Sequence, residues 1–211
     1  MSGHDVQLKA LAALRTVKSV RVTSSFTNGR ERTELKLNMD TAGRCVGSIS
    51  STFNGGMQMI TTKNALYIKG DKTWYRKQVG KGRDRRMVDF GVALFADRWV
   101  KTTPDDPALA IQSSCDIAEM VDSFRDSPTA YKGEESTVDG KPCMVLFATG
   151  DGGDIATWHI ATQGKPYLLK AVTVGNNPSE VHFSDFDKPV IIKVPVDAID
   201  ASQFSSPNRA A

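Results

Sequence analysis

Short segments in which apolar and polar residues alternate recur along the whole chain, and turn signals such as Asn28-Gly29 and Asp139-Gly140 separate them. A period of two residues is typical of β-strands that bury one face. Because short turns join the segments, we expect an antiparallel meander. The pattern predicts strands at about 20–26, 34–39, 44–53, 57–62, 65–70, 72–78, 130–138, 142–149, 153–162, 167–174 and 180–186.

Three segments instead place apolar residues at the spacing of an α-helix, namely 6–17, about 85–96, and 115–124. Helices are therefore expected at the N-terminus and in the middle of the chain. The middle one of the three is expected to carry its apolar residues on one side, and these are Met87, Phe90, Leu94 and Phe95.

The order of the elements, strands followed by helices and then strands again, is typical of an α+β protein with a single antiparallel sheet. We expect one domain over residues 1–211, with residues 79–128 as a helical insertion in the meander. A sheet of about ten or eleven strands accumulates right-handed twist and curls. The predicted fold is a half-barrel whose concave face is covered by the helices.

The composition is that of an ordinary globular protein, since 40% of the 211 residues are hydrophobic and 24% are charged. No apolar run approaches the roughly 18 to 20 residues that a membrane-spanning helix needs. The net charge of +3 is too small to favour nucleic-acid binding by itself.

The basic residues are concentrated in residues 76–86, which hold six cations and a single acid and are expected to form a loop. One interpretation is a solvated loop that keeps a strand edge soluble. The other is a loop that faces a membrane and attracts anionic headgroups. In that case the membrane-facing cations are Lys77, Lys81, Arg83, Arg85 and Arg86.

The sequence contains no known catalytic or cofactor-binding motif. Asp151, Asp154 and His159 come nearest to a catalytic cluster. However, Asp-Gly-Gly is typical of a hairpin turn, and alternation puts Trp158 and His159 on opposite faces of one strand. The three histidines are not at ligand spacing, so we expect neither a metal site nor a cofactor.

The three cysteines, Cys45, Cys115 and Cys143, are far apart in the sequence. One disulfide with a free thiol would suit an oxidising compartment, whereas three buried thiols would suit the cytosol. The number and spacing of the cysteines leave both states open.

The expected concave face carries more apolar side chains than three short helices need to cover. These side chains either pack into a closed core or line a lipid-sized cavity, and the pattern leaves both open. The candidates for the cavity wall are Val22, Phe26, Leu35, Leu37, Ile49, Met57, Met59, Leu66, Ile68, Met120 and Phe124.

The segments YIKGDKTWY, GKPYLLK and FSDFDKPV, in this order, resemble those of the actinobacterial cell-envelope lipoproteins related to LppX and LprG, which share the fold of the lipoprotein carrier LolA. The resemblance extends over about residues 5–195. It implies a half-barrel with helices across its mouth, an apolar pocket that holds acyl chains of lipids or lipoproteins, and no catalytic residue.

The resemblance also implies a disulfide between Cys45 and Cys115 that leaves Cys143 reduced. The family's secretion signal and acylated lipobox cysteine have no counterpart in the first residues, MSGHDVQLKALAALRTV. The natural protein is nevertheless expected outside the cytoplasm, attached to the outer face of the cell membrane as a lipoprotein. Its expected partners are a lipid or acylated molecule and the membrane surface, without nucleic acid, and it is expected to be a monomer.

Two functions remain after this step. The first is a non-enzymatic carrier or acceptor of lipid in the cell envelope. The second is a structural or sensory extracellular domain in which the same fold is packed shut and holds no ligand.

Overall fold

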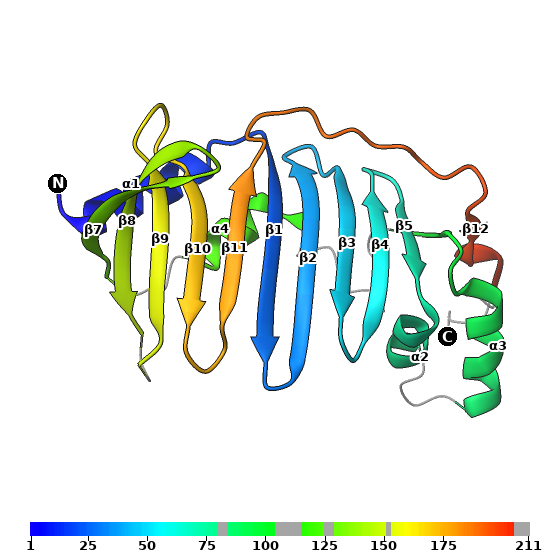
Figure 1. The fold of residues 1–211 in the computed structure, drawn as a ribbon. Helices are drawn as coiled ribbons and strands as arrows, with labels where there is room; N and C mark the ends of the chain where they lie inside the picture. The colour runs from blue at the N-terminus through cyan, green and yellow to red at the C-terminus, as the bar shows by residue number, and fades with distance from the viewer. Residues whose placement is uncertain (80–83, 104–114, 125–128, 151–152, 205–211) are drawn as a thin grey trace, which may run out of the picture.

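A single twelve-stranded sheet forms the body of the described part of the molecule (Figure 1). The computed structural model describes residues 1–79, 84–103, 115–124, 129–150 and 153–204. The strands lie in the order β12-β6-β5-β4-β3-β2-β1-β11-β10-β9-β8-β7. Their bounds are β1 Ser19–Asn28, β2 Glu31–Asp40, β3 Cys45–Ser51, β4 Gly55–Thr61, β5 Leu66–Gly70, β6 Val100–Thr102, β7 Tyr131–Val138, β8 Lys141–Thr149, β9 Ile155–Ala161, β10 Leu168–Val174, β11 Ser179–Ser184 and β12 Ile199–Asp200.

The two halves of the sheet meet at β1, which pairs with β2 on one side and with β11 on the other. Val22 of β1 is therefore flanked by Leu37 of β2 and Phe183 of β11. The ribbon formed by β10 and β11, close to the end of the chain, thus occupies the middle of the sheet rather than an edge.

Four α-helices and a short 3₁₀-helix accompany the sheet in the described residues. In the view of Figure 1, α1 and α4 lie behind the strands, whereas α2 and α3 lie beside the lower end of β5. Their bounds are α1 Gly3–Leu14, α2 Lys72–Val79, α3 Arg85–Phe95, α4 Ile117–Asp122 and η2 Ala201–Phe204.

Three of the helices are capped at the N-terminus by polar side chains. Each cap accepts hydrogen bonds from backbone N–H groups that have no partner within the helix. Ser2 Oγ accepts from the backbone nitrogen of Asp5 over 3.1 Å, and Asp84 accepts from that of Arg86 over 2.8 Å. Asp116 accepts from the first turn of α4 in the same way. These caps favour the observed starting points of α1, α3 and α4.

The main core lies between α1, α4 and the face of the sheet turned towards them, which we call the inner face. Leu14 of α1 and Val121 of α4 are fully buried, and Leu37 in the sheet is 1% exposed. Full burial of a side chain of this size contributes about 1.5 to 3 kcal/mol. The alternation seen in the sequence therefore directs apolar residues to one face of the sheet, as predicted.

The sheet has more strands than the ten or eleven predicted, because β6 and β12 are added at one edge. With three and two residues, these strands are too short to show a period of two. The predicted strand at 72–78 is wrong, since these residues belong to α2. Asp71 favours the helix, because its Oδ1 accepts from the backbone nitrogen of Trp74 over 2.7 Å.

The expected apolar side of the second helix is wrong for Met87 and Phe90, although Phe95 of the same set does pack against the core. Val88, Val92 and Phe95 of α3 pack against the core, whereas Met87 and Phe90 are 65% and 67% exposed. The segment contains apolar residues on two sides, so its pattern did not distinguish which side faces the protein.

Those of the basic residues expected to form one loop that the structure describes lie on two helices instead. Lys77 belongs to α2, and Arg85 and Arg86 begin α3. Lys81 and Arg83 lie outside the described residues. The part of the chain expected as a helical insertion, residues 79–128, contributes α3 and α4 but also strand β6 to the sheet.

Cys45, at the start of β3, forms a disulfide with Cys115, which directly precedes the start of α4. Their Cα atoms are 5.9 Å apart. Cys143 is a free, fully buried thiol, and burial raises its pKa. The pairing implied by the family resemblance is therefore confirmed.

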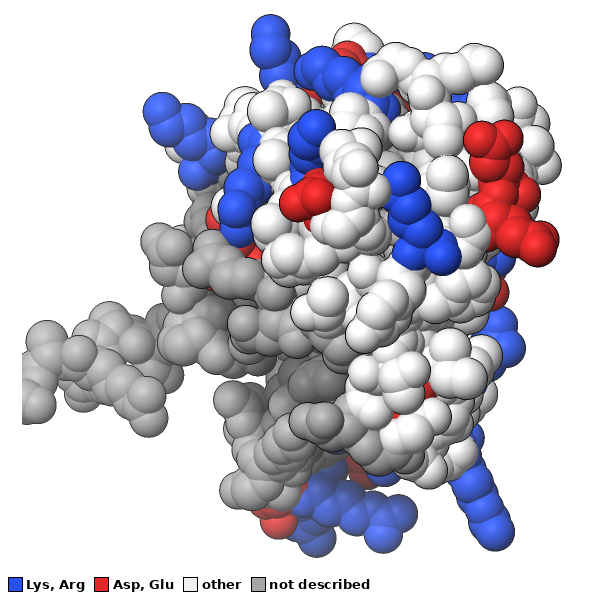
Figure 2. Space-filling model, turned by 90° about the vertical axis from the view of Figure 1, so that its left-hand side faces the viewer, with Lys and Arg blue, Asp and Glu red and all other residues white. Residues whose placement is uncertain are grey.

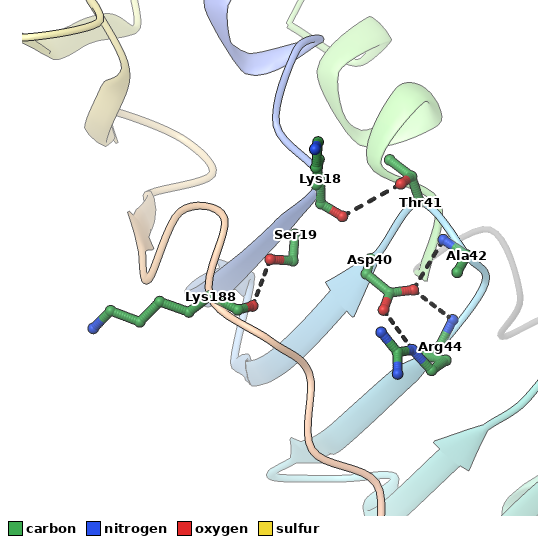
Figure 3. Close-up of polar contacts among 7 residues, drawn as sticks. All are labelled: Lys18, Ser19, Asp40, Thr41, Ala42, Arg44 and Lys188. Carbon is green, nitrogen blue, oxygen red and sulfur yellow. Dashed lines mark hydrogen bonds and ion pairs between the residues drawn. The ribbon is translucent and has the colours of Figure 1, made fainter.

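An extended segment that we call the strap, residues 185–198, runs from β11 along one end of the sheet to β12 (Figure 1). It is fixed to β1 where Ser19 Oγ donates to the backbone oxygen of Lys188 over 2.5 Å (Figure 3). Beside this contact, the buried carboxylate of Asp40 accepts from Arg44 Nε over 2.6 Å and from the backbone nitrogen of Ala42. The strap is thus attached at a hydrogen-bonded corner of the sheet.

Candidate functional site

A pocket of about 330 Å³ lies on the inner face, at the end of the sheet where β8 turns into β9 and β10 into β11. Its floor comes from β9, β10 and β11, and Ser123 and Phe124 after α4 form its wall. The lining residues are Ser123, Phe124, Gly150, Asp154, Ala156, Trp158, Ala171, Thr173, Ser179 and Val181.

Small side chains create this hollow. Ala148, Ala156, Thr173 and Ser179 are cross-strand neighbours in one row across β8 to β11. Neighbours in such a row project from the same face, so a row of small residues leaves space above the sheet. Phe26 of β1 lies beside Ser179 at the end of this row.

Aromatic side chains close the pocket on its inner side. The ring of Phe124 meets that of Trp158 edge to face, with centroids 5.6 Å apart, and that of Phe183 at 5.9 Å. Trp158 is buried and Phe124 is half-buried. The pocket therefore has an apolar interior formed by two rings and by aliphatic side chains of β9 to β11.

Polar groups lie towards the hairpin end of the pocket. Asp154 Oδ1 accepts from the backbone nitrogen of Asn176 over 2.9 Å, which joins the two hairpins. Thr173 and Ser179 add hydroxyl groups nearby. An apolar wall with a few polar groups on one side is the usual composition of a small-molecule pocket.

Most of the residues expected to line a cavity lie in the packed part of the core instead of at this pocket. Phe124 lines the pocket, and Phe26, which is 45% exposed, lies at its border. Leu35, Ile49 and Met120 are partly buried against the core. Those buried in the main core are Val22, Leu37, Met57, Met59, Leu66 and Ile68. That these residues line a lipid cavity stays a prediction.

The pocket residues that the sequence reasoning missed are mostly small. Ala156, Ala171 and Thr173 alternate correctly with their neighbours but add little to an apolar pattern. One signal could have identified them. The side chains that face inward near the turns of two neighbouring hairpins are all small.

Two smaller hollows lie elsewhere on the described surface. One of about 220 Å³ lies beneath the strap, between Val190 and the strand residues Arg21, Asn38 and Val46. Another of about 170 Å³ is lined by residues of β1, β2 and β11. Both are smaller than the roughly 300 Å³ from which typical ligand pockets begin.

The segment that came nearest to a catalytic cluster does not converge in the described residues. Trp158 lies in the main core, and His159 lies on the opposite face of β9, as predicted. Asp154 is held in the hairpin contact with Asn176, and Asp151 lies outside the described residues. No group of three or more His, Cys, Asp or Glu residues that could hold a metal ion occurs in the described ranges.

His159 gives a testable dependence of stability on pH. Burial lowers its pKa, and the neighbouring charges of Lys170 and His182 lower it further. The unfolded chain therefore binds a proton more readily than the folded protein does, so stability must fall as pH drops below about 6.5.

We expect His159→Gln to reduce this loss of stability between pH 7.5 and 5. The measurement is urea denaturation of both proteins at several pH values, with His4→Gln as the control. A pH profile that is the same in His159→Gln and in the original protein would contradict this assignment.

The charged residues on the side of the molecule next to β7 are mixed. In Figure 2, Lys and Arg lie mainly over the upper part and at the lower end, Asp and Glu lie among them, and uncharged surface separates the two regions. The described residues on this face form no continuous basic stripe of the kind that follows a nucleic-acid backbone.

No helix in the described parts of the chain has both the length and the apolar character needed to cross a membrane.

No family model and no curated protein sequence matches this chain. Solved structures do match it. The lipoprotein LppX of Mycobacterium tuberculosis is 13% identical, with a TM-score of 0.56 over 90% of this chain and 98% of that one. LprF of Mycobacterium bovis is 14% identical, with a TM-score of 0.59 over 92% of this chain and 96% of that one. At these identities the likeness concerns the fold, which is the LppX-like fold that the sequence resemblance implied.

Proposed function

Starting from this LppX-like fold, we propose that the protein is a non-enzymatic carrier or acceptor of lipid in the cell envelope, and that its pocket takes an acyl chain. The observation that carries the proposal is the pocket of about 330 Å³ between Phe124 and the floor of β9 to β11. This volume lies within the range of about 300 to 1,000 Å³ of ligand pockets. The family that the sequence resembles is expected to hold acyl chains in an apolar pocket, which supports the proposal.

The chemistry of the pocket favours a lipid over a polar metabolite. Its apolar walls, Phe124, Trp158 and Val181, can bury methylene groups at about 0.8 kcal/mol for each one. The few polar groups lie on one side, where they can meet the polar end of a lipid. Such a pocket selects by chain length and volume and discriminates little between similar chains.

The Cys45–Cys115 disulfide supports a location outside the cytoplasm, because disulfides persist in oxidising compartments. We place the natural protein, in this proposal, at the outer face of the cell membrane as a lipoprotein and a monomer. Its partners are then a lipid or acylated molecule and the membrane surface.

A second function is favoured by a different observation. Leu37, Met59 and Leu66, all expected at a cavity, are 1% exposed or less and belong to one packed cluster. A structural or sensory extracellular domain with a closed core would show the same burial. The experiment must therefore test the pocket beside Phe124 rather than the centre of the sheet.

We expect native mass spectrometry of the purified protein to detect bound lipid, and Ala156→Trp to remove it. The indole would fill the floor of the pocket from β9, so binding of an apolar fluorescent probe should fall by at least about tenfold, or 1.4 kcal/mol. Stability should change little, since the new ring enters open space.

The matched control is Thr157→Trp, which places the same ring on the opposite face of the same strand. This variant should bind the probe as the original protein does. If the original protein carries no lipid and binds no probe, the second function, a structural or sensory domain with a closed core, is the correct one. Equal binding by both tryptophan variants would exclude this pocket.

A further inference from the structure

Helix α3 exposes apolar side chains on the side that faces away from the protein. Met87 is 65% exposed and Phe90 is 67% exposed, although both are large and apolar. Leu94 follows one turn after Phe90 and is partly exposed. Residues separated by three or four positions lie on one side of a helix, so these three side chains form a stripe.

The opposite side of the same helix is also apolar. Val88, Val92 and Phe95 pack against the core, and Phe95 stacks on Tyr75 of α2 with ring centroids 6.3 Å apart. A helix at the edge of a globular protein normally has one apolar side and one polar side. The outward stripe of α3 therefore needs an explanation other than folding of this domain.

Cations lie near the start of the stripe. Arg85 and Arg86 in the first turn of α3 are exposed, and Lys77 is exposed on the adjoining helix α2. Two acids oppose them, the exposed N-cap Asp84 and Asp89, which lies 3.8 Å from Arg76 and 4.0 Å from Arg85. The surface thus combines apolar side chains with a local excess of positive charge.

We propose that α3 is an interfacial helix that docks the protein on an anionic lipid bilayer. In this arrangement Met87, Phe90 and Leu94 enter the boundary between headgroups and acyl chains, while the arginines contact the lipid phosphates. The positive charge argues against a second copy of this chain as the occupant, because the same basic surface would face itself. The proposal goes beyond the lipid pocket, since a protein with a closed core could dock in the same way.

The test is cosedimentation of the full chain with vesicles of phosphatidylcholine alone and of phosphatidylcholine with phosphatidylglycerol. We expect binding to the anionic vesicles, weaker binding in high salt, and little binding to the neutral ones. Met87→Ser with Phe90→Ser should lower affinity for the anionic vesicles by at least about tenfold. Because both side chains are exposed, the variant should keep its melting temperature.

The matched control replaces two exposed aliphatic residues of the strap, Ile191→Ser with Val196→Ser, which are 75% and 103% exposed. This variant should bind as the original protein does. A second readout attaches an environment-sensitive fluorophore to Phe90→Cys or to Val196→Cys, because the remaining free thiol, Cys143, is fully buried. Only the label at position 90 should shift to shorter wavelength on anionic vesicles.

Four results would overturn the proposal. The first is that the original protein binds neither kind of vesicle. The second is that both serine pairs weaken binding equally, and the third is that the label at position 90 does not respond. The fourth is a dimer in light scattering that Met87→Ser with Phe90→Ser dissociates, which would make a second copy the occupant.

Discussion

Replacing Cys45 and Cys115 together with alanine is expected to lower the free energy of unfolding by about 4 kcal/mol. The two cysteines are separated by 70 positions, so their bond removes much of the chain entropy of the unfolded state. The bond also holds the start of α4, which has six residues and is too short to be stable alone. Since Phe124 follows α4, we expect the wall of the pocket to loosen with it.

Urea denaturation of the original protein and of the double variant measures this loss. The control is Cys143→Ala, which removes a buried thiol without a crosslink and should cost far less. A reducing agent should bring the original protein to the stability of the double variant and leave the variant unchanged. If the double variant is as stable as the original protein, the disulfide adds nothing to the fold.

The second large effect is expected for Leu37→Trp in the middle of the sheet. Leu37 is 1% exposed, and it fills the space over Gly47 on the neighbouring strand. A Cβ atom at Gly47 would lie 2.7 Å from Leu37 Cδ2, so there is no free volume between these strands. Excess volume in a packed core costs about 1 to 3 kcal/mol, and we expect a value near the upper end.

The matched comparison for Leu37→Trp is Ala156→Trp, which adds an even larger side-chain volume at the pocket. A loss of stability at position 37 with little loss at position 156 would locate the available space at β9 to β11. Retained stability in Leu37→Trp, together with lost probe binding, would instead place the ligand at the centre of the sheet, among the candidate cavity residues named from the sequence.

Much of the fold can be predicted from the alternation of apolar and polar residues, because this alternation arises within each strand. Each long strand has one buried face, so its period is visible in the sequence. The strand β6 has three residues and carries no period, so its place in the sheet depends on pairing with β5 over a distance in sequence. Residues 72–78 contain Trp74 and Tyr75, which are residue types enriched in strands, but the carboxylate of Asp71 caps a helix there.

The candidate site was harder to predict for a different reason. The candidate cavity residues are large and apolar, as Leu37 and Met59 are, and large residues are those that fill a core. A pocket arises where side chains are small, and Ala156 and Thr173 become a hollow only because their strands are neighbours. On α3, likewise, exposure of Phe90 depends on which side of the helix meets the sheet.

The central position of β1 has a consequence for how the chain is made. β1 ends at residue 28, but its second neighbour, β11, is complete only at residue 184. Until then a nascent chain carries β1 with one open edge of unpaired backbone groups, which is prone to pair with other chains. Sheets with such distant pairings fold slowly. We therefore expect synthesis in the cell to depend on a chaperone that shields this edge until β10 and β11 have been synthesised.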